Sequence, residues 1–520
     1  MAQGIFMSSD SISVVSPTDV PSARVLDRKF VTAALMLVMV LASMEQTVTS
    51  TAMPTIIGEL HGLEHYSWVA SIYLLACTVS MPLYGRLADA LGRKRVILGA
   101  IILFCGASLL ASTAHTMVQL VIFRGFQGLG AGGIMPVVLT IQGDVFTLEE
   151  RAKIQGLFSG VWGCAALAGP ALGAFLVKTL GWRSIFYVDL PFGMIGLLVL
   201  MWKYHDVEKP HSTDLDLPGA LTLAVGCTSV LALASRLGPG GWSYPIALAL
   251  LSIAGASFIY YRIHERRATN PIFPVEFLVS RAIGPAILCS LLIGAGFLCL
   301  DTYVPLYVQG GRGGGATAAA GVVTPVMLTW AISGVYAAPM VVRFGFRRTS
   351  LFGATLVVIG FTGLFVCSLV AAPRWVITGV LAITGLGFGP CSMSYLLAAQ
   401  EAVEWQQRGI ATSSVQFFRT IGGAVGIGML GALFNVLIRP GMAKLEAQGI
   451  KPASLLDPHT RETLPPEVLQ SAQQMIASGL KWVFAAMVLF SVIQFLLTTL
   501  MPSKSATHKL SAAEAMEALG

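Results

Sequence analysis

The sequence predicts an all-α polytopic membrane protein with fourteen transmembrane helices. Hydrophobic residues make up 55% of the 520 residues and charged residues only 11%, against about 25% charged in soluble domains. The mean hydropathy is +0.75, and apolar runs alternate with short polar loops. These values exclude an ordinary soluble domain. The net charge of +7 is not a nucleic-acid signal, because the basic residues lie in loops between apolar runs.

Each predicted span is an apolar run near the length of about 20 residues that a membrane helix needs. The fourteen spans are Phe30–Ile57, Tyr66–Leu83, Val96–Thr113, Met117–Gln142, Ile154–Val177, Ser184–Trp202, Leu217–Ser235, Trp242–Tyr261, Ala282–Val304, Ala316–Val342, Thr349–Ala372, Trp375–Gln400, Gly409–Ile438 and Trp482–Met501. Residues 439–480 form the longest predicted loop, with a short helix near Glu467–Ile476.

Basic residues are unevenly divided between the two sides of these spans. One side carries 21 of the 33 Lys and Arg residues and the other carries 10, while Arg124 and Arg419 lie within spans. Lys and Arg are retained on the cytoplasmic side of membranes. We therefore expect both termini in the cytoplasm and the 439–480 loop outside.

An internal repeat relates the first six spans to the last six. Gly128, Gly130 and Gly132 match Gly385, Gly387 and Gly389 at an offset of 257 residues, and the same offset relates Arg151 to Arg408 and Gly169 to Gly426. Gly92 matches Gly345 at an offset of 253. The expected organisation is a cytosolic tail (1–29), a six-helix half (30–202), a linker with two inserted helices (203–281), a second six-helix half (282–501) and a cytosolic tail (502–520). Repeated halves with a binding site between them are typical of secondary transporters.

Glu45 is the only charged residue between Lys29 and Glu59, inside the first span. A carboxylate at the bilayer centre costs at least about 2.5 kcal/mol and usually marks a functional site. Helical spacing places Glu45 on one face with Ala42, Thr49 and Ala52, so it is expected to face a bundle or cavity. The alternative is a carboxylate neutralised by a neighbouring helix without a transport role.

The loop between the second and third spans reads Gly85-Arg86-Leu87-Ala88-Asp89-Ala90-Leu91-Gly92-Arg93-Lys94-Arg95. Gly85 and Gly92 permit close backbone contact. Asp89, at a helix end, can accept hydrogen bonds from the N-terminus of a neighbouring helix. Arg93 and its basic neighbours can anchor the loop on an anionic leaflet. The simpler interpretation is a positively charged cytoplasmic loop.

The order of residues in this loop resembles the signature loop of the major facilitator superfamily. Fourteen spans with two inserted in mid-chain resemble its EmrB/QacA-type drug:proton antiporter branch. The first span resembles the first-helix motif of that branch through Glu45, Thr47, Val48, Ala52 and Pro54, with glutamate where the branch often has aspartate. The resemblance implies the major facilitator fold in an inner (cytoplasmic) membrane.

The fourth span, which contains Arg124 and Gln127 before the glycines, resembles the fourth-helix motif of the superfamily, whose arginine is implicated in proton coupling. A buried arginine needs an acidic or carbonyl partner, and Glu45 is the candidate. The alternative is that Arg124 reaches the outer interface. Gly128, Gly130 and Gly133 also fit a dinucleotide-binding pattern, which we reject because the glycines lie inside an apolar helix without a preceding strand.

The fifth span carries Gly156, Gly160, Gly163, Gly169-Pro170 and Gly173. Small residues at steps of three and four let helices approach closely, and Gly169-Pro170 is expected to kink the helix. Gly163, Gly169, Pro170 and Gly173 resemble the antiporter signature of exporter branches, although Ala174 replaces a usual glycine. Ordinary helix packing is the alternative.

Three further charged residues lie in or beside spans. Asp189 stands where the branch usually has asparagine and is interpreted chiefly as a local hydrogen-bonding residue. Asp301, near the outer end of the ninth span, is either a second protonation site or a solvated interfacial residue. Arg419, within the thirteenth span, is a candidate for the substrate cavity together with Thr49 and Gln127.

The residues and the resemblance together predict a proton-coupled exporter of amphipathic or cationic drug-like compounds, not an enzyme. Glu45, Arg124 and Asp301 would couple protons, and Gly85, Asp89, Gly92 and Arg93 would gate. The expected partners are the substrate, protons and the lipid bilayer, and in a Gram-negative cell a periplasmic adaptor and an outer-membrane channel. No nucleic acid, cofactor or metal is expected, since no metal-ligand cluster or nucleophile elbow occurs. The alternatives are a same-fold exporter or flippase of an endogenous lipid, siderophore or peptide and, further away, a membrane receptor or enzyme.

Overall fold

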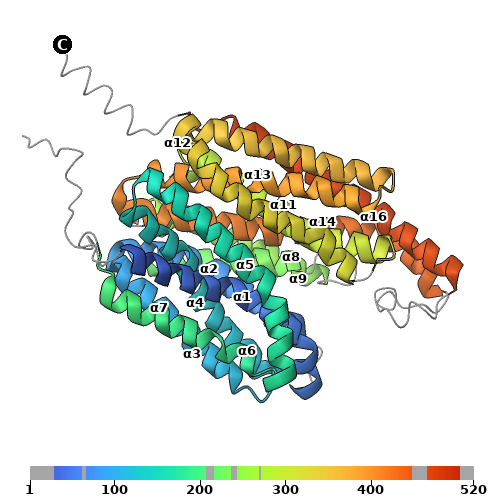
Figure 1. Cartoon of the computed structure of the whole chain (residues 1–520), viewed down its shortest axis with the longest axis horizontal. Helices are drawn as coiled ribbons and strands as arrows, with labels where there is room; N and C mark the ends of the chain where they lie inside the picture. The colour runs from blue at the N-terminus through green and yellow to red at the C-terminus, as the bar shows by residue number, and fades with distance from the viewer. Residues whose placement is uncertain are drawn as a thin grey trace, which may run out of the picture.

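The structure is a computed structural model that describes residues 28–60, 66–206, 216–235, 243–268, 271–314, 316–447 and 465–503. The regular secondary structure in these ranges is helical throughout. Figure 1 shows two groups of long helices lying side by side, with the blue-to-green first half below the yellow-to-red second half.

Seven helices form the first half and two more follow it. They are α1 (Arg28–Leu60), α2 (Tyr66–Leu91), α3 (Arg93–Ser112), α4 (Met117–Val145), α5 (Leu148–Leu180), the short α6 (Ser184–Tyr187), α7 (Asp189–Lys203), α8 (Leu217–Ser235) and α9 (Tyr244–Glu265). The pair α8 and α9 corresponds to the two inserted spans. They pack against each other, and α8 also contacts α2 and α14.

The second half begins after the short α10 (Glu276–Val279). Its elements are α11 (Gly284–Leu306), the π-helical turn η2 (Tyr307–Gly311), α12 (Ala316–Leu369), α13 (Arg374–Glu401), the 3-10 turn η3 (Trp405–Gln407), α14 (Arg408–Ala447) and α16 (Pro466–Thr498). The halves meet chiefly where α12 packs on α5 and where α14 packs on α2 and α4.

Two segments differ from the sequence prediction. The predicted spans Ala316–Val342 and Thr349–Ala372 run into each other as α12, which bends at Gly345, where φ is 79° and ψ is 172°. The predicted 439–480 loop is helical at both ends, because α14 continues through Pro440 to Ala447 and α16 already begins at Pro466. The predicted short helix near Glu467–Ile476 is therefore the start of α16.

The repeat in the sequence is also a repeat of packing. An added Cβ at Gly128 would lie 2.4 Å from the Tyr73 carbonyl oxygen in α2, and one at Gly130 would lie 2.6 Å from the Phe104 nitrogen in α3. In the second half, Gly385 approaches the Val326 carbonyl oxygen to 2.4 Å and Gly387 approaches that of Gly353 to 2.5 Å, by the same measure. Glycine removes the side chain that would keep these helices apart, so both halves use the motif in the same way.

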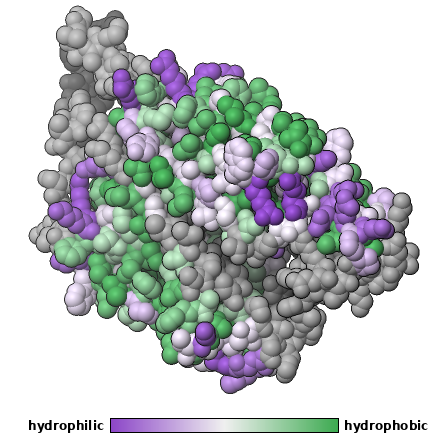
Figure 2. All heavy atoms as spheres, turned by 45° about the vertical axis from the view of Figure 1, so that its right-hand side comes forward, coloured by the Kyte–Doolittle hydropathy of each residue, from purple (hydrophilic) through white to green (hydrophobic). Residues whose placement is uncertain are grey.

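Apolar residues cover the outer helix faces. Among the described residues, ten helices are long and apolar enough to cross a membrane, and Pro218–Ala234 is a shorter apolar helix. Large exposed side chains such as Ile122, Phe126, Ile195 and Leu251 lie on these faces, and Figure 2 shows hydrophobic patches among polar residues on the visible face. Such surface is stable in a bilayer rather than in water. The molecule is therefore a multi-pass membrane protein, while the count of fourteen spans stays a prediction.

Candidate functional site

Glu45 of α1 and Arg124 of α4 form a buried ion pair in the first half. Each residue is only 2% exposed, and Arg124 Nη1 donates to Glu45 Oε1. Thr49, one turn after Glu45, donates its hydroxyl to the same oxygen at 2.7 Å. Arg124 thus faces the inside of the bundle rather than the outer interface. Removing Arg124 would leave Glu45 buried and uncompensated, which is strongly unfavourable.

The ion pair continues into a chain of buried polar groups. Arg124 Nη1 donates to Gln127 Oε1 at 2.7 Å, and Gln127 Nε2 donates to Asp189 Oδ2 at 3.2 Å. The Ser108 hydroxyl donates to that same Asp189 oxygen at 2.7 Å. Asp189 is 4% exposed. Helices α1, α3, α4 and α7 therefore contribute to one polar cluster, which we call the Glu45 cluster and define as Glu45, Thr49, Ser108, Arg124, Gln127 and Asp189.

Glu45 itself lies near the middle of its helix. Glu45 is 17 residues after the start of α1 and 15 before its end, which at 1.5 Å per residue is roughly 25 Å from either terminus. Tyr73 of α2 closes one side of the cluster, with the Arg124 guanidinium 4.3 Å from its ring centroid. An ionisable group at this depth exchanges protons only when the surrounding helices give it access to one side.

A second polar site joins the two halves at the end that carries the basic loops. Asp89, near the end of α2, accepts hydrogen bonds from the backbone nitrogens of Gly409 (3.1 Å) and Ile410 (3.0 Å) in the first turn of α14. A carboxylate at a helix N-terminus satisfies free N–H groups and complements the helix dipole. An added Cβ at Gly85 would lie 2.8 Å from the Gly409 carbonyl oxygen, so the glycine permits this contact.

Arg93 occupies the centre of this second site and is 1% exposed. It pairs with Asp89 and Asp144, both at 2.9 Å, and donates to the Trp405 carbonyl oxygen of the second half at 3.2 Å. The Trp405 ring centroid lies 4.0 Å from its guanidinium carbon. Gly92, at φ 93°, makes the left-handed turn that brings Arg93 back under α2.

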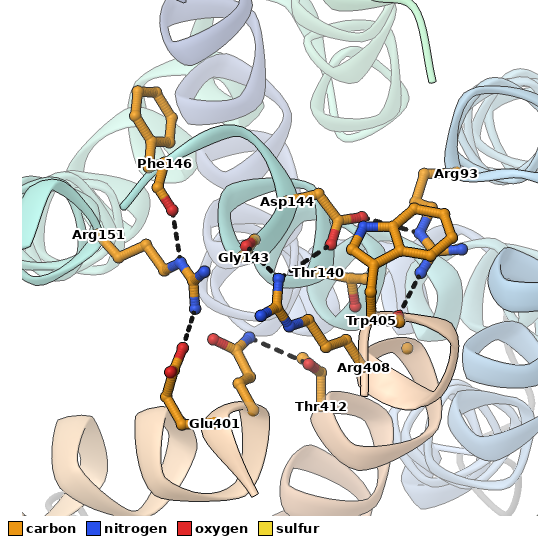
Figure 3. A network of polar contacts seen from close by, with 12 residues as sticks. Arg93, Thr140, Gly143, Asp144, Phe146, Arg151, Glu401, Trp405, Arg408 and Thr412 are labelled. Carbon is orange, nitrogen blue, oxygen red and sulfur yellow. Dashed lines mark hydrogen bonds and ion pairs between the residues drawn. The ribbon is translucent and has the colours of Figure 1, made fainter. Parts of the chain in front are cut away.

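Two more cross-half contacts lie on one side of Arg93 (Figure 3). Arg151 of α5 pairs with Glu401 of α13 at 2.8 Å. Arg408 of α14 donates to the Gly143 carbonyl oxygen at 3.1 Å, and its Nη1 atom lies 3.9 Å from Asp144. In these two contacts, an arginine of each half therefore faces an acid of the other half. We call Asp89, Arg93, Asp144, Arg151, Glu401 and Arg408, together with Gly85 and Gly409, the cytoplasmic-loop clasp, after the predicted location of these loops.

Sequence reasoning did not identify Asp144 and Glu401, although a signal was present. They are separated by 257 residues, the same offset that relates Arg151 to Arg408. Here an acid and an arginine both recur at the repeat offset. If the equivalent helices of the two halves meet, this pattern predicts that the arginine of each half pairs with the acid of the other. The pairing itself depends on contacts between residues about 250 positions apart.

Asp301 and Arg419 do not join the Glu45 cluster. Asp301 is exposed on α11 and forms no hydrogen bond or ion pair with another residue that the structure describes. Both of its predicted roles, as a second protonation site and as a solvated interfacial residue, therefore stay predictions. Arg419 borders a cavity of about 60 Å³ that is lined almost wholly by the second half, together with Gln155 of α5. Its guanidinium lies 5.8 Å from the Trp330 ring centroid.

The glycines of α5 are described only in part. Gly169 and Gly173 are buried, whereas the surroundings of Gly163 and Pro170 lie outside the described residues, as do those of Thr47 and Pro54. Nearer the clasp, an added Cβ at Gly156 would lie 2.7 Å from the Val335 Cα of α12. This face of α5 therefore does serve close packing between the halves, while a special role of residues 163–173 stays a prediction.

A larger apolar cavity lies between the inserted helices and the second half. It has a volume of about 590 Å³ and is lined by α8, α9, α11 and α14, with Arg262 on its border. It shares no lining residue with the Glu45 cluster. Its walls, which include Phe258, Phe417 and Phe418, suit hydrocarbon or aromatic groups.

Two repeated helical halves, a buried acid–arginine pair in one of them and a polar clasp between them define a membrane transport protein. Residues 35–427 match the sequence profile of the Major Facilitator Superfamily. The chain belongs to this superfamily of transporters.

Relatives of known name support the same placement. The chain is 34% identical over 409 residues to Multidrug transporter protein MdtP of Bacillus subtilis, covering 78% of this chain and 75% of that protein. It is 30% identical over 482 residues to Multidrug resistance protein 3 of the same organism, covering 90% and 93%. It is 29% identical over 413 residues to Citrate exporter 1 of Yarrowia lipolytica, covering 77% and 60%. The crystal structure of the human organic anion transporter MFSD10 (TETRAN) superposes with a TM-score of 0.61 at 14% identity, covering 90% and 99%, which shows a shared fold alone.

Proposed function

We propose that the protein is a proton-coupled exporter of amphipathic, drug-like compounds. The observation that carries the proposal is the buried Glu45–Arg124 ion pair near the middle of the first half. In this pair Glu45 can be ionised while Arg124 faces it, or protonated when Arg124 is free to interact elsewhere. Proton binding thus changes a buried interaction, which is what a coupled transporter needs in order to bias its conformations.

The clasp supplies the second element of the mechanism. It holds the halves together on the side predicted to be cytoplasmic, and it consists of ionic and helix-capping contacts that have to break when that side opens. Repeated-half transporters alternate access by rocking one half against the other. The structure corresponds to a state closed at the clasp, and proton binding and substrate binding would each favour one of the two states.

The names of the relatives support export of drugs. Two of the proteins similar to this chain are named for multidrug transport or resistance, and the predicted fourteen-span organisation, with α8 and α9 inserted and α12 counted twice, fits the EmrB/QacA-type branch. We expect the protein in the cytoplasmic membrane, with both termini inside. Selectivity would be loose, because apolar and aromatic walls discriminate weakly between amphipathic compounds.

A second candidate is export of an endogenous amphiphile by the same fold. The apolar cavity of about 590 Å³ with Arg262 on its border favours it, since a lipid-like compound with an anionic group would match both features. The name of the citrate exporter adds small organic anions to the compounds worth testing.

Proteoliposomes with an imposed proton gradient would test the proposal. Ethidium, tetraphenylphosphonium, chloramphenicol and citrate form a suitable first panel, and internal pH is recorded together with substrate flux. We expect at least one cation to move protons in the opposite direction. Glu45→Gln should abolish this coupled proton movement, because the amide cannot release a proton.

Glu59→Gln is the matched control, since it makes the same change on the same helix outside the Glu45 cluster. It should leave coupled flux unchanged. If Glu45→Gln folds and still moves protons with substrate as the unchanged protein does, proton coupling through Glu45 is wrong. If substrate moves only down its own gradient and without proton movement, the protein is a facilitator instead.

A further inference from the structure

The charges of the Glu45 cluster do not balance. It contains two carboxylates, Glu45 and Asp189, but a single cation, Arg124, and all three are at most 4% exposed. With both acids ionised the cluster would carry a net charge of −1 among buried side chains. Burial of an uncompensated charge is costly enough that such groups take up a proton instead.

The other neighbours do not supply the missing positive charge. Ser108 and Gln127 donate neutral hydrogen bonds to Asp189. Among the residues that the structure describes, the remaining titratable groups that face the cluster are Tyr73 and Cys77 of α2 and Cys105 of α3, none of which is a cation. Although Asp189 begins α7, Val188 before it is helical and its nitrogen bonds to Ser184, so α6 leads almost directly into α7 and offers little free helix-terminal charge.

The two acids are also joined through shared partners. Arg124 donates to both Glu45 and Gln127, and Gln127 in turn donates to Asp189 at 3.2 Å. Neighbouring carboxyl groups at a shared site release their protons in two steps that belong to the pair.

We propose that Asp189 is a second proton-binding residue, and that Glu45 and Asp189 share one proton while Arg124 stays charged. This inference rests on the proposed proton coupling and extends it: the coupling site is a pair of acids. The shared proton leaves no buried net charge in the state closed at the clasp. A second proton would neutralise both acids and free Arg124 from its ion pair, whereas loss of the shared proton would leave the cluster with a net negative charge. A transported cation could compensate for that charge.

Infrared titration of the full-length protein in lipid vesicles tests this without a transported substrate. The C=O stretch of protonated carboxyl groups reports proton binding directly. The unchanged protein should show two steps from the pair. Asp189→Asn should remove one step and shift the remaining Glu45 step at least one pH unit below the upper step of the unchanged protein, a tenfold loss of proton affinity, because only Arg124 would then face Glu45.

Ser108→Ala is the second variant and predicts a shift in the opposite direction. It removes a donor that favours the ionised form of Asp189, so the upper step should move to higher pH. Ser112→Ala on the same helix, whose hydroxyl donates to the Leu109 carbonyl oxygen at 2.6 Å, is the matched control and should leave both steps in place.

If Asp189→Asn retains the upper step at its original pH and amplitude, Asp189 is a structural residue that does not exchange protons, and the inference is overturned. That result is separate from the test of the proposed function. Coupled flux that survives Glu45→Gln would defeat the proposed function, whereas an unaltered Asp189→Asn titration with flux lost in Glu45→Gln would defeat only the shared-proton pair. A silent Ser108→Ala would count against the pair as well.

Discussion

The two basic loops of the repeated halves occupy equivalent places but make opposite use of their charges. In the first half, Arg93 is buried between Asp89, Asp144 and the second half. In the second half, 253 residues further on, Val342 and Phe346 stand at the positions of Asp89 and Arg93, and Arg347 and Arg348 are exposed. Both loops turn through a glycine with positive φ, Gly92 and Gly345. The turn is therefore common to the repeat, while the clasp needs the acids.

The difference shows how one copy of a repeated loop gains a contact between the halves that the other copy lacks. A basic loop alone anchors to an anionic leaflet and contributes to orientation. Asp89 converts the same turn into a contact with the N-terminus of α14, so it ties one half to the other. The second loop has no acid at the position of Asp89 and leaves its arginines available to solvent or lipid headgroups.

The largest effect is expected when the buried cation of the first loop is removed. Arg93→Ala removes the ion pair of the buried Asp89 and leaves Asp144 with Arg408 alone, at 3.9 Å, which should cost about 3–5 kcal/mol of stability in the closed arrangement. Thermal unfolding in detergent and cysteine accessibility at the clasp would measure it. Arg347→Ala in the second loop should stay within about 0.5 kcal/mol. Equal effects of the two substitutions would contradict the comparison.

The glycine contact beneath the first loop should be the next most sensitive feature. An added Cβ at Gly85 would lie 2.0 Å from the Ser413 hydroxyl oxygen, whereas the equivalent position in the second half is Ala338. Gly85→Ala should destabilise the closed clasp by about 1–3 kcal/mol through overpacking and raise cysteine accessibility there. Gly99→Ala in α3, where an added Cβ meets nothing within 4 Å, should be neutral or stabilising. A closed clasp in Gly85→Ala would refute the steric argument.

The reciprocal arginine–acid pairs should contribute less, because they are less completely enclosed. The Arg151 and Glu401 side chains are 8% and 13% exposed. A double-mutant cycle of Arg151→Ala and Glu401→Ala should give a coupling energy on the order of 1 kcal/mol. The same cycle on the Arg28–Glu150 pair, exposed by 47% and 43%, should give at most about half of that. A larger coupling in the exposed pair would reverse the ranking.

The smallest effect is expected at the opposite end, where Glu59 joins α1 to the segment before α6 rather than to the other half. Hydrogen bonds from Arg183 and Trp182 lower the pKa of Glu59 below its ordinary value. The stabilisation is therefore present above the unfolded-state pKa and disappears as pH falls through the lower folded pKa. Glu59→Gln should reduce the loss of thermal stability on acidification without changing accessibility at the clasp. An opened clasp in this variant would contradict its confinement to one half.

Much of the fold was accessible from local patterns. Apolar length and loop charge predict the spans, and the predicted bounds for α1 to α4 agree with the structure to within a few residues, apart from the longer end of α2. Errors occur where local signals are weak. Pro440 suggested a loop but lies inside α14, because a helix can continue past proline when packing compensates for one missing hydrogen bond. The two predicted spans on either side of Gly345 follow each other without a loop, because the positive φ of this one glycine changes the direction of the helix.

The site was accessible to a smaller degree. Glu45, Arg124 and Asp89 stand out in the sequence because each is a charge or an acid at an unusual position in an apolar or glycine-rich pattern. Asp144 and Glu401 stand at the C-terminal ends of α4 and α13, where the apolar runs give way to polar loops, so local hydropathy does not mark them. Asp189 resembles a helix-start residue and gains its significance only from the neighbouring Glu45.

The sequence by itself determined that the chain is a helical membrane protein with a repeat. The reason is that insertion of each segment into a bilayer depends on its own length and hydropathy. It also determined which charges are costly. Only the tertiary structure decided which charges meet. Arg124 reaches Glu45 from another helix, Arg151 reaches Glu401 across 250 residues, and Asp189 joins an acid that already has its arginine. These pairings depend on how whole helices pack, and helical periodicity specifies a residue's face without specifying the partner that covers it.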